Sequence, residues 1–366
     1  MKKNFYRFVA VAALLGVAAC GSDSDDSAST ETTASETNST GPASDEAPTT
    51  TEEPPATTPA EPIRVGITQF ATIPPLDGLR EAFIERMNEE YGEDGWEFDY
   101  LPAEGVVGNT APIAQQLSSG DYDIFLGIAT ASTQALANEV DDRPIIFGAV
   151  ADPVGAGIRD DDSGDDGNVT GVSSLGPIAD QMKLIIDSSP DIRTFGFIYN
   201  DAEQNAIFQA DVAEAALAEL GDFEVVRTTA ASTAEVAAAA QQLASQVDVI
   251  WFPASSTALE GLPALVQVSE STGVPLFCAD TTAVKPANPE DGAPGCLGTV
   301  GFSFPRSGTI AAELAIQVLN GAAPGSIPTV YVPADATVLN LCAAKAQGFV
   351  FPQSVINAAT EVIDCQ

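Results

Sequence analysis

Short apolar runs alternate with longer segments of helical periodicity over most of the chain after residue 62. Several of the apolar runs have few polar positions, which is typical of strands that are buried on both faces. The intervening segments space their apolar side chains three and four residues apart, as Leu79, Phe83 and Met87 show within 76–91. This pattern predicts an α/β fold in which helices cover parallel sheets.

The alternation runs twice along the chain. The first array predicts strands at 63–67, 96–101, 123–128 and 144–147, and helices at 76–91, 111–117 and 132–140. The second array predicts helices at 178–188, 205–220, 233–245 and 258–272, and strands at 194–199, 223–227, 247–252 and 275–278. An acidic loop and a break near 171–175 separate the arrays, and a last strand and helix are expected at 299–304 and 307–319. Two such lobes would form one cleft at the carboxyl ends of their strands, closed by hinge motion.

The first 62 residues have a different composition. Three of the first seven residues are basic, and the apolar stretch 8–19 that follows fits a secretory signal but is too short to span a membrane. Residues 21–62 are almost entirely Ser, Thr, Ala, Pro, Asp and Glu, with ten acids, no base and no aromatic residue. Such a segment cannot bury enough apolar surface to offset its ordering entropy. We expect a signal peptide at 1–20 and a disordered acidic tether at 21–62, with a shed pro-segment as the alternative to the tether.

Charge and histidine content narrow the possible chemistry. The chain has 14 Lys and Arg against 52 Asp and Glu, a net charge of −38, which repels phosphate backbones and disfavours a nucleic-acid partner. Histidine is absent from the sequence, so His-dependent catalytic triads and His-ligated metal sites are excluded. A carboxylate-based enzyme such as a glycosidase and a protein that binds without catalysis remain. Among so many acids a chance pair carries no weight, so we expect no enzyme activity and no cofactor.

Candidate ligand-contacting residues follow the carboxyl ends of the expected strands. In the first array they are Gln69, Phe70, Thr130, Ala131, Ser132 and Asp152. In the second array they are Asn200, Glu203, Asn205, Ser255, Ser256, Thr257 and Asp280. Because the carboxyl ends of parallel strands meet at one edge of a sheet, we expect each set to face the cleft.

These residue types suit an amino-acid zwitterion. Residues 130–132 open an expected helix, whose free N–H groups and dipole favour a carboxylate, and 255–257 hold the equivalent place in the second array. The ammonium group needs an acid, for which the candidates are Asp280, Asp152 and Glu203. Simpler interpretations stay open: N-capping for the Ser and Thr clusters, a turn for Asp152, and core packing rather than ring stacking for Phe70.

Four cysteines lie in the body of the chain. They are Cys278, Cys296, Cys342 and Cys365. An even number in an exported protein favours disulfides, and four cysteines allow three pairings. We expect neighbours in the sequence to pair, Cys278 with Cys296 and Cys342 with Cys365. The spacing contains no C-x₂-C pair, so a zinc site is not expected.

The end of the apolar stretch, VAACG at 17–21, resembles a bacterial lipobox. In lipoproteins of this type the cysteine becomes the lipidated first residue, so the resemblance implies a lipid on Cys20 and an extracytoplasmic protein anchored to the outer face of the bacterial cell membrane. An ordinary signal peptide with a chance cysteine is the alternative.

Several stretches of the body resemble one family over nearly all of 63–364. They are VGITQF, GIATASTQ, DPVGAG, GNVTGVS, the YN…E.N pattern and FCADT. They are similar to the tryptophan/tyrosine-uptake branch of ABC-transporter substrate-binding lipoproteins, which have the type I periplasmic-binding-protein fold. Two features depart from the family pattern: Ala206 stands where serine is common, and 286–298, with Cys296, replaces the family's usual segment.

The resemblance implies two Rossmann-like lobes with parallel sheets, joined by a hinge of three crossovers. It implies an N-terminal lobe of 63–173 with 300–327 and a C-terminal lobe of 174–299 with 328–366. It also implies a monomer that captures a small amino-acid-like ligand, with aromatic amino acids as first candidates, and delivers it to the permease and ATPase subunits of an ABC importer. A ligand-sensing lipoprotein with no transport role is the alternative. A repressor of this fold is excluded, because the signal and tether occupy the place of a DNA-binding head.

Overall fold

The computed structural model describes residues 61–164, 167–285 and 295–365. The expected signal peptide, the candidate lipidation site Cys20 and the tether up to residue 60 lie outside the described residues. So does most of the departing segment 286–298.

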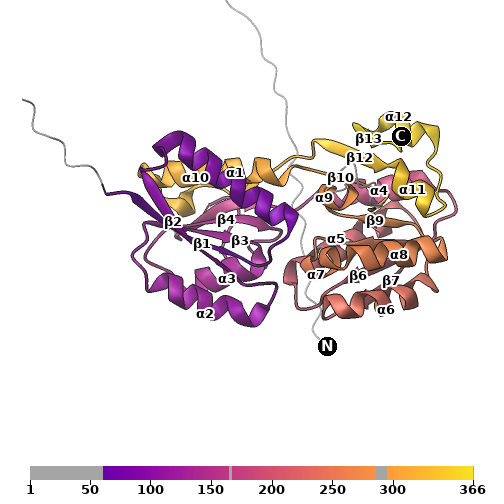
Figure 1. Ribbon diagram of the computed structural model, residues 1–366, viewed down its shortest axis with the longest axis horizontal. Coiled ribbons are helices and arrows are strands. Elements are labelled where there is room, and N and C mark those ends of the chain that lie inside the picture. Colours follow the sequence, from indigo (N-terminus) through magenta and orange to yellow (C-terminus); the bar gives the residue numbers. More distant parts are fainter. Residues whose placement is uncertain (1–60, 165–166, 286–294, 366) are drawn as a thin grey trace, which may run out of the picture. The chain divides into compact units, whose positions relative to one another are not determined.

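The N-terminal lobe, at the left of Figure 1, is built on a parallel sheet with the strand order β11-β5-β4-β3-β1-β2. Its strands are β1 (Ile63–Gln69), β2 (Trp96–Pro102), β3 (Ile124–Ile128), β4 (Ile145–Val150), β5 (Val169–Ser173) and β11 (Val330–Tyr331). One face is covered by α1 (Pro74–Tyr91) and α10 (Phe304–Leu319), and the other by α2 (Val107–Ser118) and α3 (Thr130–Glu139). The predicted doubly covered parallel sheet is therefore confirmed.

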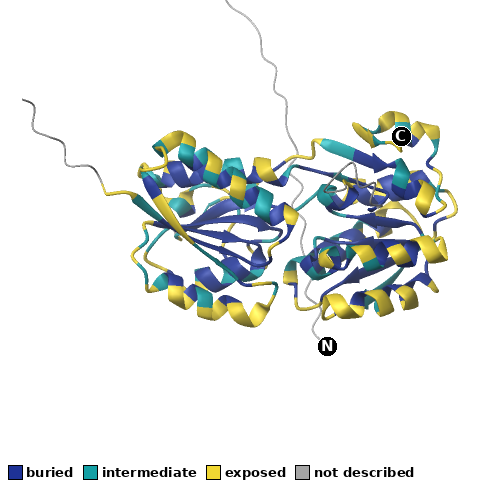
Figure 2. Cartoon of the chain, in the orientation of Figure 1, coloured by how far each residue is buried: buried dark blue, intermediate teal, exposed yellow. Residues whose placement is uncertain are grey.

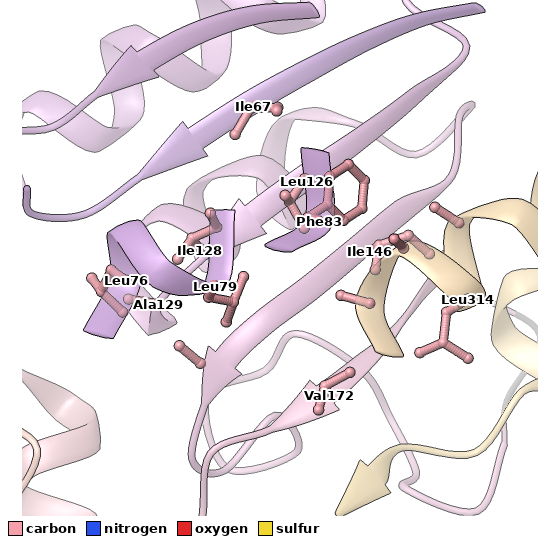
Figure 3. Close-up of a cluster of buried hydrophobic side chains, with 14 of the residues drawn as sticks. Ile67, Leu76, Leu79, Phe83, Leu126, Ile128, Ala129, Ile146, Val172 and Leu314 are labelled. Carbon is pink, nitrogen blue, oxygen red and sulfur yellow. The ribbon is translucent and has the colours of Figure 1, made fainter. Parts of the chain in front are cut away.

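Successive side chains of these strands enter two different cores, as the pleat of a strand requires. Ile146 of β4 belongs to the core under α1 and α10, whereas its neighbours Ile145 and Phe147 belong to the core under α2 and α3. Figure 3 shows the first core, where Phe83 of α1 and Leu314 of α10 lie over the sheet. Buried strands between helices with exposed outer faces give the layered pattern of Figure 2.

The helices α1 and α10 approach each other closely at Gly308. A Cβ atom at this position would overlap the main-chain carbonyl of Leu79. Only glycine leaves room for so close a backbone contact. Gly308 therefore fixes how a C-terminal helix packs on the first helix of the body.

The C-terminal lobe has a second parallel sheet with the order β7-β6-β8-β9. Its strands are β6 (Thr194–Tyr199), β7 (Glu224–Thr229), β8 (Val249–Phe252) and β9 (Leu276–Cys278). Helices α4 (Ile178–Ser188) and α5 (Gln204–Leu220) cover one face, and α6 (Thr233–Ala244) and α8 (Leu262–Thr272) cover the other. The short helices of this lobe are α7 (Ser256–Glu260), α9 (Thr281–Val284), α11 (Leu341–Ala346) and α12 (Gln353–Ala358), whereas the 3₁₀ turn η2 (Pro324–Ser326) contacts β5 of the N-terminal lobe.

A smaller sheet beside it was not expected from the sequence. It has the order β10-β12-β13, with β10 (Gly298–Gly301), β12 (Ala336–Asn340) and β13 (Glu361–Ile363). The β10–β12 pair is antiparallel and the β12–β13 pair is parallel. The lobe therefore combines a parallel sheet with a mixed one.

The chain passes between the lobes three times. Strand pairing places the crossings at 174–177, at 302–303 between β10 and α10, and at 332–335 between β11 and β12. The expected lobe boundaries at 299/300 and 327/328 lie a few residues earlier, because β10 pairs with β12 and β11 pairs with β5.

Two further expectations differ from the structure. The helix expected at 258–272 is divided at Gly261 into α7 and α8. Pro263 lies in the first turn of α8, where a helix tolerates proline. The expected break near 171–175 overlaps the end of the buried strand β5, whose short sequence VTGVS has only two apolar side chains and so gives a weak hydrophobic signal.

One of the two expected disulfides is formed. Cys342 and Cys365 are bonded, whereas Cys278 and Cys296 are free, buried thiols in contact with each other. The expectation of a Cys278–Cys296 bond is corrected accordingly. Burial raises the pKa of both thiols, which disfavours the thiolate that thiol–disulfide exchange requires.

Within the described ranges, no helix combines the length and the apolar character needed to cross a membrane.

Candidate functional site

The candidate site lies where the strand order of each parallel sheet reverses. In the first sheet β1 lies between β2 and β3, and in the second β6 lies between β7 and β8. At such a point two adjacent strands, β1 and β3 or β6 and β8, continue into connections that run to opposite faces of the sheet. A crevice is left between these connections at the carboxyl ends of the strands. The residues that follow β1, β3 and β8 meet at one cavity in the described structure.

The cavity encloses about 850 Å³ of empty space, part of which is open to solvent. Both lobes contribute to it. Its apolar walls come from Phe70, Ile73, Pro75, Leu76, Val107, Ala131, Phe252, Leu259 and Phe304. Its polar groups come from Thr130, Gln134, Ser174, Glu203, Gln204, Asn205, Ser255, Ser256 and Asp280. A large apolar surface with a few polar groups fits a ligand that has a bulky apolar part and a charged end.

The N-terminus of α3 forms one end of the cavity. Helix α3 begins at Thr130 behind Ala129, which provides no side-chain cap. The first N–H groups of a helix have no partner inside it and carry the positive end of the helix dipole. The Thr130 side chain is 3% exposed, and its Oγ1 has no hydrogen-bond partner among the described residues although it lines the cavity. A ligand carboxylate would satisfy both the N–H groups and this hydroxyl.

Two alanines beside this helix end adopt positive φ angles. Ala129 has φ 72° and Ala149 has φ 57°, and both line the cavity. Non-glycine residues pay a steric cost in this region, and such conformations cluster at functional sites. With this conformation the Ala129 N–H donates a hydrogen bond to the Gly148 carbonyl at 2.9 Å, and the chain turns from β3 into α3.

Asp280 supplies an anionic group from the other lobe. It follows β9 and is 6% exposed, and its Oδ1 accepts hydrogen bonds from the Thr282 N–H at 2.7 Å and the Thr282 hydroxyl at 2.9 Å. Its Oδ2 accepts none from the described residues. Burial without a cationic partner raises the pKa of Asp280 to about 6. Asp280 is thus a carboxylate with one oxygen free and a cost of ionisation that an ammonium group would offset.

Glu203 is also buried at the cavity, but the protein already satisfies it. Its Oε1 accepts from the Ser255 hydroxyl and the Thr257 N–H, both at 3.0 Å, and its Oε2 accepts from the Ser256 N–H at 2.6 Å. Burial raises its pKa and these donors oppose the rise. Glu203 therefore acts first as an anchor for the 255–257 segment.

The Ser and Thr cluster at 255–257 has the structure of a cap. Ser255 is the N-cap of α7 and accepts from the Ala258 N–H, as the simpler interpretation predicts. Ser255 and Ser256 line the cavity, while Thr257 accepts a hydrogen bond from Asn200 at 2.9 Å. Asn205 lines the cavity and donates to the Ala254 carbonyl at 2.7 Å.

Other candidates lie behind the cavity wall or away from it. Gln69 is fully buried and joins β1 to α1, since it donates to Asp77 at 2.8 Å and accepts from Arg80 at 2.9 Å. Ser132 is buried behind the wall. Asp152 accepts from the Gly155 N–H at 2.8 Å, as a turn residue does, and lines a neighbouring cavity instead.

The sequence did not point to several residues of the site. Gln134 and Gln204 donate to carbonyls of the loop after β4, at Ala156 (2.7 Å) and Gly155 (3.2 Å). The second bond joins the two lobes. Leu259 of α7 likewise packs against cores of both lobes. Gln204 lies inside the quoted YN…E.N pattern, whereas nothing in the sequence marks Leu259.

A family model for "ABC transporter substrate binding protein" matches residues 64–363, nearly the whole described body. The chain belongs to this family. Substrate-binding proteins of ABC transporters are extracytoplasmic, bind small ligands and work with a permease and an ATPase, and solute-binding proteins of this kind are not enzymes.

Individual relatives of this substrate-binding protein agree with the family match. A tyrosine-binding protein of Clostridioides difficile (strain R20291) is 29% identical over 284 residues, which are 77% of this chain and 80% of the relative. The structure resembles a Streptococcus pneumoniae ABC domain in complex with L-Trp, with TM-score 0.76 and 31% identity over 82% of this chain and 99% of the other. It also resembles a ligand-free, open substrate-binding protein with adhesive properties from Clostridium difficile, with TM-score 0.61 and 26% identity over 83% and 100%.

Proposed function

We propose that this substrate-binding protein captures an aromatic amino acid between its lobes and delivers it to the permease of an ABC importer. The observation that carries the proposal is the cavity that joins the α3 N-terminus to Asp280 across an apolar interior. The helix end suits the ligand carboxylate, Asp280 suits the ammonium group, and the apolar walls suit an aromatic ring. The L-Trp complex and the tyrosine-binding relative support the same ligand class.

The arrangement of the lobes supports a clamp. Gln204 bridges to Gly155 in the other lobe, and Leu259 contacts both cores. The TM-score is higher to the complex with L-Trp than to the ligand-free, open structure. Ligand capture by closure would bury the ring against walls from both lobes, and the three crossings would serve as the hinge. A sensor without a transporter would use the same clamp.

Calorimetry against the twenty amino acids tests the ligand class. The protein is first unfolded and refolded to remove any carried-over ligand. We expect L-tryptophan or L-tyrosine to bind with a Kd below about 100 µM, or roughly −5.5 kcal/mol. Binding of a sugar or an inorganic anion without any amino acid would contradict the aromatic amino-acid proposal and leave the clamp intact.

We further propose that a lipid on Cys20 anchors the body through the acidic segment 21–62. The lipobox-like VAACG and the composition of the segment support this. In a bacterial host, Cys20→Ala should abolish the lipid-bearing N-terminal peptide and release the protein from the membrane fraction. One acyl chain binds a membrane only marginally, so firm retention of the parent implies more than one. Unchanged retention and unchanged mass of the variant would contradict the anchor.

A further inference from the structure

A second, smaller chamber is lined in part by Asp280 and lies next to two of the crossings between the lobes. Its lining includes Ser174 and Gly176 of the first crossing and Phe302 of the second. Asp280 and Phe304 line both this chamber and the main cavity, so they form part of the wall between the two. The chamber has a volume of about 10 Å³, roughly what one water molecule needs.

Two buried glutamines bring polar groups to this chamber. Gln181 of α4 is 1% exposed, and its Nε2 donates to the carbonyls of Ala279 at 3.1 Å and Val300 at 2.8 Å. Because both of these partners are carbonyl acceptors, the side-chain amide of Gln181 must turn its nitrogen toward them. Its oxygen, Oε1, is then buried with no hydrogen-bond partner among the described residues. Gln209 of α5 is 2% exposed and accepts from the Ala254 N–H at 2.8 Å, so its Nε2 is left as a donor.

We propose that the chamber binds one water molecule, which donates to Gln181 Oε1 and Asp280 Oδ2 and accepts from Gln209 Nε2. Three polar partners are the usual number for a buried water. The water occupies one of the two acceptor positions on the second oxygen of Asp280 and leaves the other for the ligand's ammonium group, and it satisfies the amide oxygen that the protein leaves unpaired. A buried polar group without a partner destabilises the fold, and a bound water in the chamber removes this cost.

Gln181 then acts as a positioning residue for the ligand's ammonium partner. The positioning role of Gln181 rests on the proposed function, whereas the water site does not. A donor to the ionised carboxyl favours ionisation and holds Asp280 in the orientation that faces the cavity. The titratable groups around Asp280 are the thiols of Cys278 and Cys296 and, across the main cavity, Glu203. None of these is a cation, so the water and Thr282 are its stabilising partners.

A crystal structure of the unliganded full-length protein that resolves ordered water tests the site directly. We expect a single density peak within hydrogen-bond distance of Asp280, Gln181 and Gln209. A chamber without density, or one closed by a neighbouring side chain, would overturn the proposal. This result does not depend on any ligand, so it stands apart from a failure of the proposed function.

The positioning role is tested by Gln181→Met, with L-tryptophan as the calorimetric probe between pH 5 and 8. Loss of the water should raise the pH at which the affinity for L-tryptophan is half-maximal by about half a pH unit to one pH unit. The matched control is Gln246→Met, which removes a carbonyl-bonded glutamine outside the cavity and should leave the midpoint in place. A uniform loss of affinity with an unmoved midpoint would show a structural role only and overturn this part. If Gln181→Met does not fold, Gln209→Met replaces it with the same expectation.

Discussion

Asp280→Asn should weaken binding of the aromatic amino acid by about 30-fold or more, because truncating one partner of a buried charge pair costs about 2–5 kcal/mol. The asparagine keeps an oxygen that can accept from Thr282, so the turn into α9 is preserved. Titration calorimetry at pH 7.5 measures the loss. Asp152→Asn is the matched control, since it makes the same change in a carboxylate that serves a turn outside the main cavity, and it should bind within about twofold of the parent.

The same substitution should stabilise the ligand-free protein. The pKa of Asp280 is raised from 3.8 to about 6, so its contribution to stability is fully present below pH 3.8 and is lost as the pH rises through 6. Above pH 6 the parent therefore carries a cost of about 3 kcal/mol that the uncharged asparagine avoids. Thermal unfolding at pH 4 and pH 8 should show a gain for Asp280→Asn only at the higher pH.

The affinity of the parent should fall below about pH 6, because protonated Asp280 offers the ammonium no charge. Asp280→Asn should lose this dependence. Equal affinity of the parent and Asp280→Asn would contradict the assignment and would make Glu203 the ammonium partner, to be examined by Glu203→Gln.

Gly308→Ala should destabilise the body by about 1–3 kcal/mol or more, because the added methyl group overlaps the Leu79 carbonyl and main-chain atoms cannot move aside as a flexible side chain can. Gly108→Ala in α2 provides the matched control. A Cβ at Gly108 meets no atom within 4 Å, and alanine favours a helix over glycine by up to about 1 kcal/mol. Chemical denaturation should therefore give changes of opposite sign, and equal changes would contradict a tight α1–α10 contact.

Periodicity was a sufficient guide where the strands are apolar and the helices long. The runs at β1, β3, β6 and β8 are buried and almost free of charge, so their positions follow from the sequence. Strand β5 reads VTGVS and was missed, because its burial depends on β4 and β11 on either side rather than on its own hydrophobicity. Of the mixed sheet only β10 was predicted, as the strand expected at 299–304, because β12 and β13 are short and pair with segments distant in sequence or in a different sheet from the one expected.

The candidate site shows what local sequence leaves open. Asp152, Glu203 and Asp280 all follow strands and all were candidates for the ammonium group. The structure gives each different partners: the Gly155 N–H for Asp152, three donors for Glu203, and donors to one oxygen only for Asp280. The partners of Glu203 come from the distant segment 255–257, whereas those of Asp152 and Asp280 lie two or three residues further along the chain. The sequence does not show which of these carboxylates the fold buries at the main cavity.

The three crossings also set the order in which the protein becomes complete during synthesis. The N-terminal lobe begins at β1, yet α10 and β11 close its core and sheet edge some 240 residues later along the printed sequence. Until Phe304–Leu319 has been made, the apolar face of α1 and the sheet beside it have no cover. The N-terminal lobe is not a continuous stretch of chain, so its core and one edge of its sheet stay open until α10 and β11 have been made.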